Sequence, residues 1–240
     1  MMDKITFDIL LLIARPAAGK SEIIDYLKRT DLEERIRRFH IGQFDEIDDF
    51  PMLWTWFEED ALLEQMGESR LHTDKDGYFL KTSYWNLLIE RIALEYQKKL
   101  RNIEDYENKF STLVEFSRGS EHGGYKSAFE HLSQQMIQKM AAFYVDVPFE
   151  ESLRKNRKRF NPDKPDSILE HALPDEKLIR LYKEVDWEEI SRGDEKYLSI
   201  QGQKVPYVVF ENGDDVTTGR GEELGSRLES RLNQLWAIYK

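Results

Sequence analysis

The feature that most constrains the fold is an apolar run that ends in a turn of small residues. Most residues from 5 to 13 are apolar, which is typical of a strand covered on both faces in a parallel sheet. The run is too short to span a membrane. The turn at residues 14–19 leads into Lys20-Ser21 and a helical pattern over residues 22–29. A strand, a tight turn and a helix in this order indicate an α/β protein.

The same turn predicts a phosphate-binding loop. Consecutive backbone N–H groups can point at an anion only where side chains are small, and Ala17, Ala18 and Gly19 meet that need. Lys20 supplies a mobile cation for the outer phosphates, and Ser21 supplies a hydroxyl for Mg²⁺ at the positive end of a helix. The alternative is a chance Gly-Lys-Ser at a helix start. The turn matches the pattern G-x-x-x-x-G-K-[ST], except that Ala14 replaces the first glycine. The predicted nucleotide-binding residues are Ala14, Arg15, Pro16, Ala17, Ala18, Gly19, Lys20 and Ser21.

Composition narrows the class of function. The 240 residues carry a net charge of −11, which disfavours nucleic acid as a partner, because phosphate neutralisation needs a basic face. The absence of cysteine excludes disulfides, thiolate zinc sites and cysteine nucleophiles. We see no secretory signal, so we expect a cytoplasmic protein without a membrane partner. The ligand class that remains is small anions.

An acidic cluster follows a predicted second strand, RRFHIGQ, at residues 37–43. Ligands bind beyond the carboxyl ends of parallel strands, so these acids are candidates to meet an acceptor substrate or its metal. A solvated turn explains them equally well. Asp45 and Glu46 are preferred over Asp48 and Asp49 because they lie nearest the predicted strand end.

A further strand is predicted within residues 110–119, FSTLVEFSRG. Glu115 at its end is placed to face the reacting phosphate and, with Ser21, to hold Mg²⁺ or a metal-bound water. Arg118 offers a fork of donors to a phosphate oxygen. The alternative is a strand end capped by a charged turn, with Arg118 paired to a surface acid.

Basic residues gather after the next predicted strand, at residues 140–148. Arg154, Arg157 and Lys158 share one face of a predicted helix, so they can converge on a polyanion, although charge runs are more commonly solvated faces. On a mobile segment, Arg154 and Arg157 would stabilise a transferring phosphoryl group.

The order of these motifs resembles the P-loop small-molecule kinases, the nucleoside and nucleoside-monophosphate kinase group. The series is ARPAAGKS, the acids near Asp45, LVEFSRG and YVDVPFEESLRKNRKR, with PYVVF at residues 206–210 as the last strand. The segment Glu115-Phe116-Ser117-Arg118 loosely matches the Glu-Arg-Ser motif of the nucleoside kinases. The resemblance implies a three-layer α/β fold with a five-stranded parallel sheet in the order 2-3-1-4-5. It also implies a lid with arginines and phosphoryl transfer from ATP.

We therefore expect one domain over residues 1–240, with a helical insertion at about 51–108 and a lid-like segment at about 150–175. The main hypothesis is an ATP- and Mg²⁺-dependent kinase for a small molecule, possibly a nucleoside or nucleotide. Lys20 would hold the donor phosphates, and Asp45 or Glu46 would orient or deprotonate the acceptor. The competing hypothesis is a nucleotide-binding switch or assembly protein of the same fold. The aromatic stripe within 51–108 serves as core, as a pocket wall or as the face of a homodimer.

Overall fold

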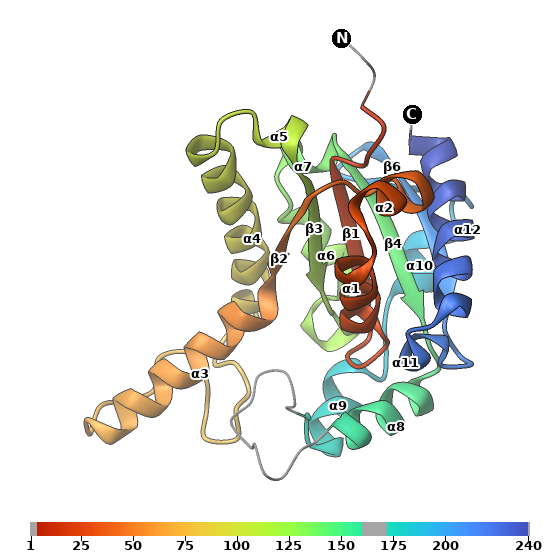
Figure 1. Ribbon diagram of the computed structural model, residues 1–240. Coiled ribbons are helices and arrows are strands. Elements are labelled where there is room, and N and C mark those ends of the chain that lie inside the picture. Colours follow the sequence, from red (N-terminus) through yellow and green to blue (C-terminus); the bar gives the residue numbers. More distant parts are fainter. Residues whose placement is uncertain (1–3, 160–171, 240) are drawn as a thin grey trace.

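The computed structural model describes residues 4–159 and 172–239 (Figure 1). At its centre lies a six-stranded sheet in the order β2-β3-β1-β4-β6-β5. Five strands run parallel, and β5 pairs antiparallel with β6 at one edge. The strands are β1 (Ile9–Ala14), β2 (Phe44–Asp48), β3 (Ser111–Phe116), β4 (Met140–Asp146), β5 (Tyr197–Ile200) and β6 (Gln203–Glu211).

The predicted α/β fold is confirmed, and so is the order of its parallel strands. With β6 as the fifth parallel strand, the sheet has the predicted order 2-3-1-4-5. The antiparallel β5 is an addition that was not predicted. It forms a hairpin with β6 through the turn at Gln201-Gly202, where both residues have positive φ.

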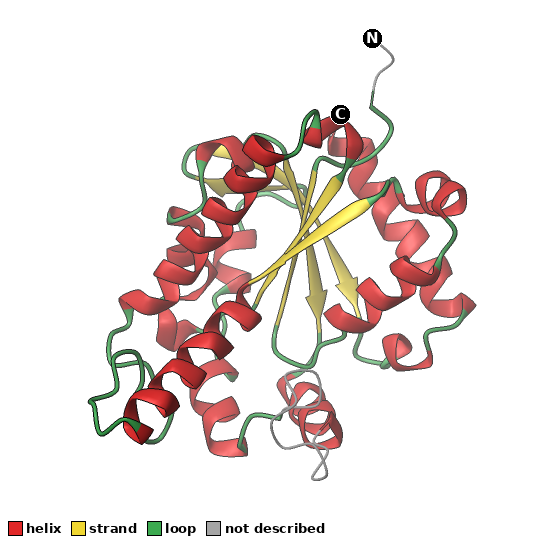
Figure 2. Ribbon diagram, turned by 60° about the vertical axis from the view of Figure 1, so that its left-hand side comes forward, coloured by secondary structure: helices red, strands yellow, loops and turns green. Residues whose placement is uncertain are grey.

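Helices cover both faces of the sheet, which Figure 2 shows as strands between two helical layers. One layer contains α1 (Lys20–Arg29), α2 (Leu32–Phe39) and α12 (Glu222–Tyr239), packed against Leu10 and Leu12 of β1. The other contains α4 (Ser83–Asn102) and α6 (Gly124–Glu130), packed against Ile9, Leu11 and Ile13. Alternate residues of β1 therefore enter opposite cores, which explains its nearly continuous apolar sequence.

One helix leaves this compact arrangement at the carboxyl end of β2. Helix α3 (Asp49–Gln65) projects away from the sheet, and a loop brings the chain back to α4 (Figure 1). On the same end of the sheet lie α8 (Phe149–Arg159) and α9 (Asp175–Tyr182). The shorter elements are α5 (Tyr106–Lys109), η1 (Ser120–His122), α7 (Gln134–Ile137), α10 (Trp187–Ser191) and α11 (Val216–Gly219).

The second strand was predicted in the wrong place. Residues 37–39 form the last turn of α2, which Asp31 caps by accepting a hydrogen bond from the N–H of Glu33 at 2.9 Å. His40 ends this helix in the left-handed region, with φ 55°, and β2 begins only at Phe44. Asp45 and Glu46 consequently lie within the strand instead of beyond it.

The two predicted substructures are placed only in part. The proposed insertion at 51–108 contains most of α3 and all of α4. In the proposed lid at 150–175, residues 160–171 lie outside the described residues, between α8 and α9. Among the residues that the structure describes, no helix is both long and apolar enough to cross a membrane.

Candidate functional site

The loop between β1 and α1 has a backbone that only small residues permit. Ala17 adopts the left-handed region with φ 55°, and Gly19, which precedes the first residue of α1, has φ 114°. A Cβ atom on Gly19 would lie 2.6 Å from Oγ1 of Thr217 and 2.9 Å from Nδ2 of Asn212. The glycine is therefore required both by conformation and by close approach of the segment after β6.

Hydrogen bonds from two other segments hold the loop from outside. Nδ2 of Asn212, which follows β6, donates to the carbonyl oxygen of Ala18 at 2.7 Å. The hydroxyl of Ser152 in α8 donates to the carbonyl oxygen of Pro16 at 2.7 Å. These contacts engage loop carbonyls, so the loop is fixed without using its N–H groups, as an anion-binding loop requires.

Lys20 reaches from the loop to the neighbouring strand end. Its ammonium group donates to Oγ of Ser117, just after β3, at 2.8 Å. Ser21 lies exposed in the first turn of α1, beside the N-terminal N–H groups of the helix. The loop, Lys20 and Ser21 thus form a continuous polar surface at the carboxyl end of the sheet, suited to a phosphate chain.

Two carboxyl groups lie beside Lys20 at the ends of adjacent strands. Asp48 and Glu115 are register partners, the last residue of β2 and the penultimate residue of β3. Burial and the nearby charge of Glu115 raise the pKa of Asp48 to about 8, and burial also raises the pKa of Glu115 against the opposing effect of Lys20. Burial and mutual repulsion therefore both favour the protonated forms of this pair.

The pair also suits a divalent cation. Mg²⁺ in nucleotide sites is commonly held by one or two carboxylates, a hydroxyl, water and phosphate oxygens. Glu115, Asp48 and Ser21 provide such donors around the loop. In residues 4–159 and 172–239, no three His, Asp or Glu side chains are grouped so as to hold a metal ion by themselves.

Asp45 and Glu46 are directed to lysines on flanking helices. Lys99 of α4 bonds the carboxylate of Asp45 at 2.8 Å, and Lys28 of α1 bonds that of Glu46 at 2.7 Å. Asp48 was ranked below them because the strand was placed too early in the sequence. Asp48 is the register partner of Glu115, whereas Glu46 acts on Glu115 only through its charge.

Arg118 is buried, with 1 % of its surface exposed, and is oriented inward. Its Nη1 donates to Asp49 at 2.6 Å, and its Nη2 donates to the carbonyl oxygen of Trp85 at 3.0 Å. An ion pair was the alternative role that the sequence indicated for Arg118, and the structure shows an ion pair. Its acid, however, is buried Asp49 at the start of α3 and not an acid at the surface. The pair fixes α3 and α4 to the end of β3.

Arg15 extends away from the phosphate side of its own loop. Its guanidinium donates to the carbonyl oxygens of Tyr182 at 3.3 Å and Lys183 at 3.2 Å, at the end of α9, and to that of Val147 at 3.1 Å. Its side chain is therefore not directed to a phosphate group in this structure. No sequence signal distinguished this anchor from a phosphate ligand.

The two arginines of α8 form ion pairs at the surface. Arg154 contacts Glu151 at 2.6 Å and Asp215 at 2.8 Å. Arg157 contacts Asp175 of α9 at 2.6 Å. Both side chains are at least half exposed, so these pairs are weak and open to exchange with an anionic ligand.

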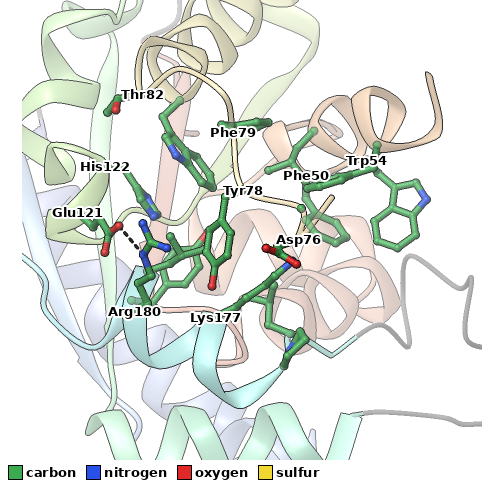
Figure 3. A pocket seen from close by; sticks show the side chains of 18 of the residues that line it. Phe50, Trp54, Asp76, Tyr78, Phe79, Thr82, Glu121, His122, Lys177 and Arg180 are labelled. Carbon is green, nitrogen blue, oxygen red and sulfur yellow. Dashed lines mark hydrogen bonds and ion pairs between the residues drawn. The ribbon is translucent and has the colours of Figure 1, made fainter. Parts of the chain in front are cut away.

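A cavity of about 480 Å³ opens beside this polar surface, between α3, the loop that follows it, the start of α4 and α9 (Figure 3). Phe50, which follows Asp49, forms part of its wall. The other aromatic lining residues are Trp54, Phe57, Tyr78, Phe79, Trp85 and Tyr182. The aromatic stripe predicted as core or pocket wall is thus partly a pocket wall.

Buried Asp60 of α3 shapes the far side of this cavity. Its carboxylate accepts from the N–H groups of Leu71 at 2.7 Å and Thr73 at 2.6 Å, and from the Thr73 hydroxyl at 2.6 Å. Burial opposes ionisation, but these hydrogen bonds prevail and lower the pKa of Asp60. They fix the loop that carries Tyr78 and Phe79. A lone acid in a helix gave no sequence signal for this role.

His122 forms the inner wall as a neutral ring. It stacks on Trp85 with centroids 3.9 Å apart, and desolvation, aided by Arg118, lowers its pKa to about 3. Nδ1 accepts from the N–H of Gly119 at 3.4 Å, which places the proton on Nε2. That donor is buried and has no hydrogen-bond partner in the described part of the chain.

Comparison with known proteins gives only distant similarities. No family model matches the chain, and no curated protein matches it. A larger number of solved structures resemble it, and the following three are among them. TT1252 from Thermus thermophilus is 14 % identical over 97 % of this chain and 98 % of its own, with a TM-score of 0.46. An unliganded sugar kinase from Janibacter is 13 % identical over 95 % of each chain, with a TM-score of 0.40.

The third is shikimate kinase from Acinetobacter baumannii in complex with shikimate. It is 14 % identical over 73 % of this chain and 75 % of its own, with a TM-score of 0.33. Two of these three proteins are therefore kinases by name. At such TM-scores, the function has to be inferred from the residues of this chain.

Proposed function

We propose that this protein transfers the γ-phosphoryl group of ATP to a hydroxyl group of a small molecule. The observation that supports this most is that the loop and the Asp48–Glu115 pair lie at the same edge of the sheet. The loop follows β1, which pairs with the strand of Glu115, and that strand pairs with the strand of Asp48. A nucleotide-binding protein needs the loop alone. A phosphotransferase also needs a group that handles the proton of the acceptor beside the terminal phosphate.

The loop and Lys20 are assigned to the donor. Backbone N–H groups of residues 17–20 would hold the phosphate oxygens, and the ammonium of Lys20 would move from Ser117 to the outer phosphates. Ser21 and Glu115 would hold Mg²⁺, which would neutralise charge on the transferring phosphate. A cation bound there favours the ionised carboxylates, because it reverses the effect that raises their pKa.

Asp48 is assigned to the acceptor in place of Asp45 and Glu46. Both of those residues are engaged by lysines, whereas Asp48 faces Glu115 and feels the charge of Lys20. As an ionised group, it would orient the acceptor hydroxyl and accept its proton. Arg154 and Arg157 remain candidates to contact the transferred phosphate, because both side chains are at least half exposed.

The first experiment is ADP release from MgATP over a panel of nucleosides, nucleotides, sugars and other hydroxyl compounds. The wild-type protein should show turnover with one class of acceptor. Lys20→Ala and Asp48→Asn should each reduce that turnover at least about a hundredfold, in line with the loss of a charge-stabilising or proton-transfer group. Lys28→Ala removes an exposed lysine from the same helix and should leave turnover unchanged.

A second function is favoured by one specific observation. Arg15, Arg118, Arg154 and Arg157 all have partners within the protein, so the structure presents no unengaged arginine among these candidates. A nucleotide switch transfers no phosphate to an acceptor, so it needs no unengaged arginine. This alternative predicts tight, Mg²⁺-dependent ATP binding, no acceptor-stimulated ADP release from any compound of the panel, and normal nucleotide binding by Asp48→Asn.

A further inference from the structure

The cavity beside the phosphate loop has a composition that selects among ligands. Seven aromatic side chains line it, and Figure 3 shows Tyr78, Phe79, Phe50 and Trp54 arranged around one space. The edges and faces of such rings interact favourably with the π surface of a flat, unsaturated ring. A saturated ring of the same size lacks that surface and gains only contact area.

The basic side chains that line the cavity differ in whether they already have an ion-pair partner in the protein. Arg180 is paired with Glu121 at 2.7 Å, and Arg70 is paired with Glu64 at 2.7 Å (Figure 3 shows the former). Lys75 is exposed at the rim. Lys177 is partly buried and has no hydrogen bond or ion pair within residues 4–159 and 172–239. Its ammonium lies 5.1 Å from the ring centroid of Tyr78.

The position of Lys177 directs its charge to the cavity. The ammonium lies against the backbone of Gly77, where a Cβ atom would come within 2.6 Å of it. Burial lowers the pKa of Lys177, although Asp74 and Asp76 act in the opposite direction. An anion on the ligand would supply the partner that this lysine lacks.

The surrounding charges favour a single negative charge over two. Phosphate groups are usually recognised by arginine forks, and both arginines of the wall are engaged by carboxylates. Asp76 lines the same cavity and would repel a dianion. The single charge of Lys177, with acidic side chains around it, therefore favours a ligand with one carboxylate over a ligand with a phosphate group.

We infer that the cavity binds an aromatic hydroxy acid: a flat unsaturated ring with one carboxylate, held by Lys177, and with the hydroxyl that accepts the phosphoryl group. This inference deepens the proposed phosphotransferase function and rests on it.

The test measures binding, by quenching of tryptophan fluorescence and by calorimetry, apart from turnover. The probes are para-(hydroxymethyl)benzoate, its saturated cyclohexane analogue, its neutral benzamide analogue and benzyl phosphate. We expect the benzoate to bind at least about tenfold more tightly than each of the others, because a charge-assisted hydrogen bond and ring contacts each contribute on that order.

Lys177→Met keeps the length of the side chain and removes its charge. It should weaken benzoate binding about tenfold or more and leave benzamide binding unchanged. Lys183→Met is the matched control, because it removes the same charge from an exposed position directly after α9, outside the cavity. It should change neither.

Three results would overturn the inference: equal binding of the benzoate and its saturated or neutral analogue, tighter binding of benzyl phosphate, or no saturable binding of the benzoate up to about 10 mM. Phosphorylation of a sugar or another non-aromatic acceptor with the same results would leave the phosphotransferase function intact. ATP binding without turnover on any acceptor would instead reject that function.

Discussion

Replacing Arg118 by methionine separates a structural from a catalytic role for this residue. Only 1 % of its side chain and 9 % of that of Asp49 are exposed, and their atoms are 2.6 Å apart. Without the arginine, Asp49 would be left as a buried charge without its cation. Breaking a buried pair in this way costs about 3–5 kcal/mol. For a domain of this size, that loss corresponds to a decrease of about 6–20 °C in melting temperature.

The assay is thermal and urea unfolding of three variants at pH 7. Arg118→Met should show the full loss, and adding Asp49→Asn should recover part of it, because the uncompensated charge is removed. Arg29→Met is the matched control: its 3.0 Å pair with Asp25 is exposed, so it should cost less than about 1 kcal/mol. If Arg118→Met unfolds like the wild type yet loses acceptor-dependent turnover, the structural assignment is wrong and Arg118 acts on the phosphate.

Three other outcomes are expected. Gly19→Ala should abolish nucleotide binding, measured with a fluorescent ATP analogue, because its Cβ would lie 2.6 Å from Oγ1 of Thr217; ATP binding by a correctly folded variant would refute this. Asp48 has a folded pKa of about 8, above the value of an unfolded aspartate, so its stabilising contribution is complete below about pH 4 and is lost as the pH rises through 8. Urea unfolding between pH 5 and 8 should therefore show a smaller decline in Asp48→Asn than in the wild type, and equal declines would contradict the raised pKa. Arg15→Met should leave the carbonyl oxygen of Tyr182 without its donor and raise amide hydrogen exchange in α9, while unchanged exchange would show that the anchor is not needed.

The first strand and the turn after it could be predicted from the sequence because their structure depends on residues that are close together in the chain. A strand between two helical layers has to be apolar on both sides, and every residue of β1, ILLLIA, is apolar. The second strand was misplaced because its sequence, FDEID, is mostly acidic. Its polar residues lie at a sheet edge, where Lys28 of α1 and Lys99 of α4, 18 and 54 residues away in sequence, neutralise two of them. No window around residue 45 contains those lysines.

By itself, the sequence determined the α/β class, the order of the parallel strands through its resemblance, and the tight turn of small residues between β1 and α1. These depend on spacing and on the size of neighbouring side chains. Only the tertiary structure decided which charges are available. It paired Arg118 with Asp49, turned Arg15 to the end of α9, and set Asp48 beside Glu115. A charged side chain acts according to what lies within a few ångströms of it, and in this fold those neighbours come from distant segments.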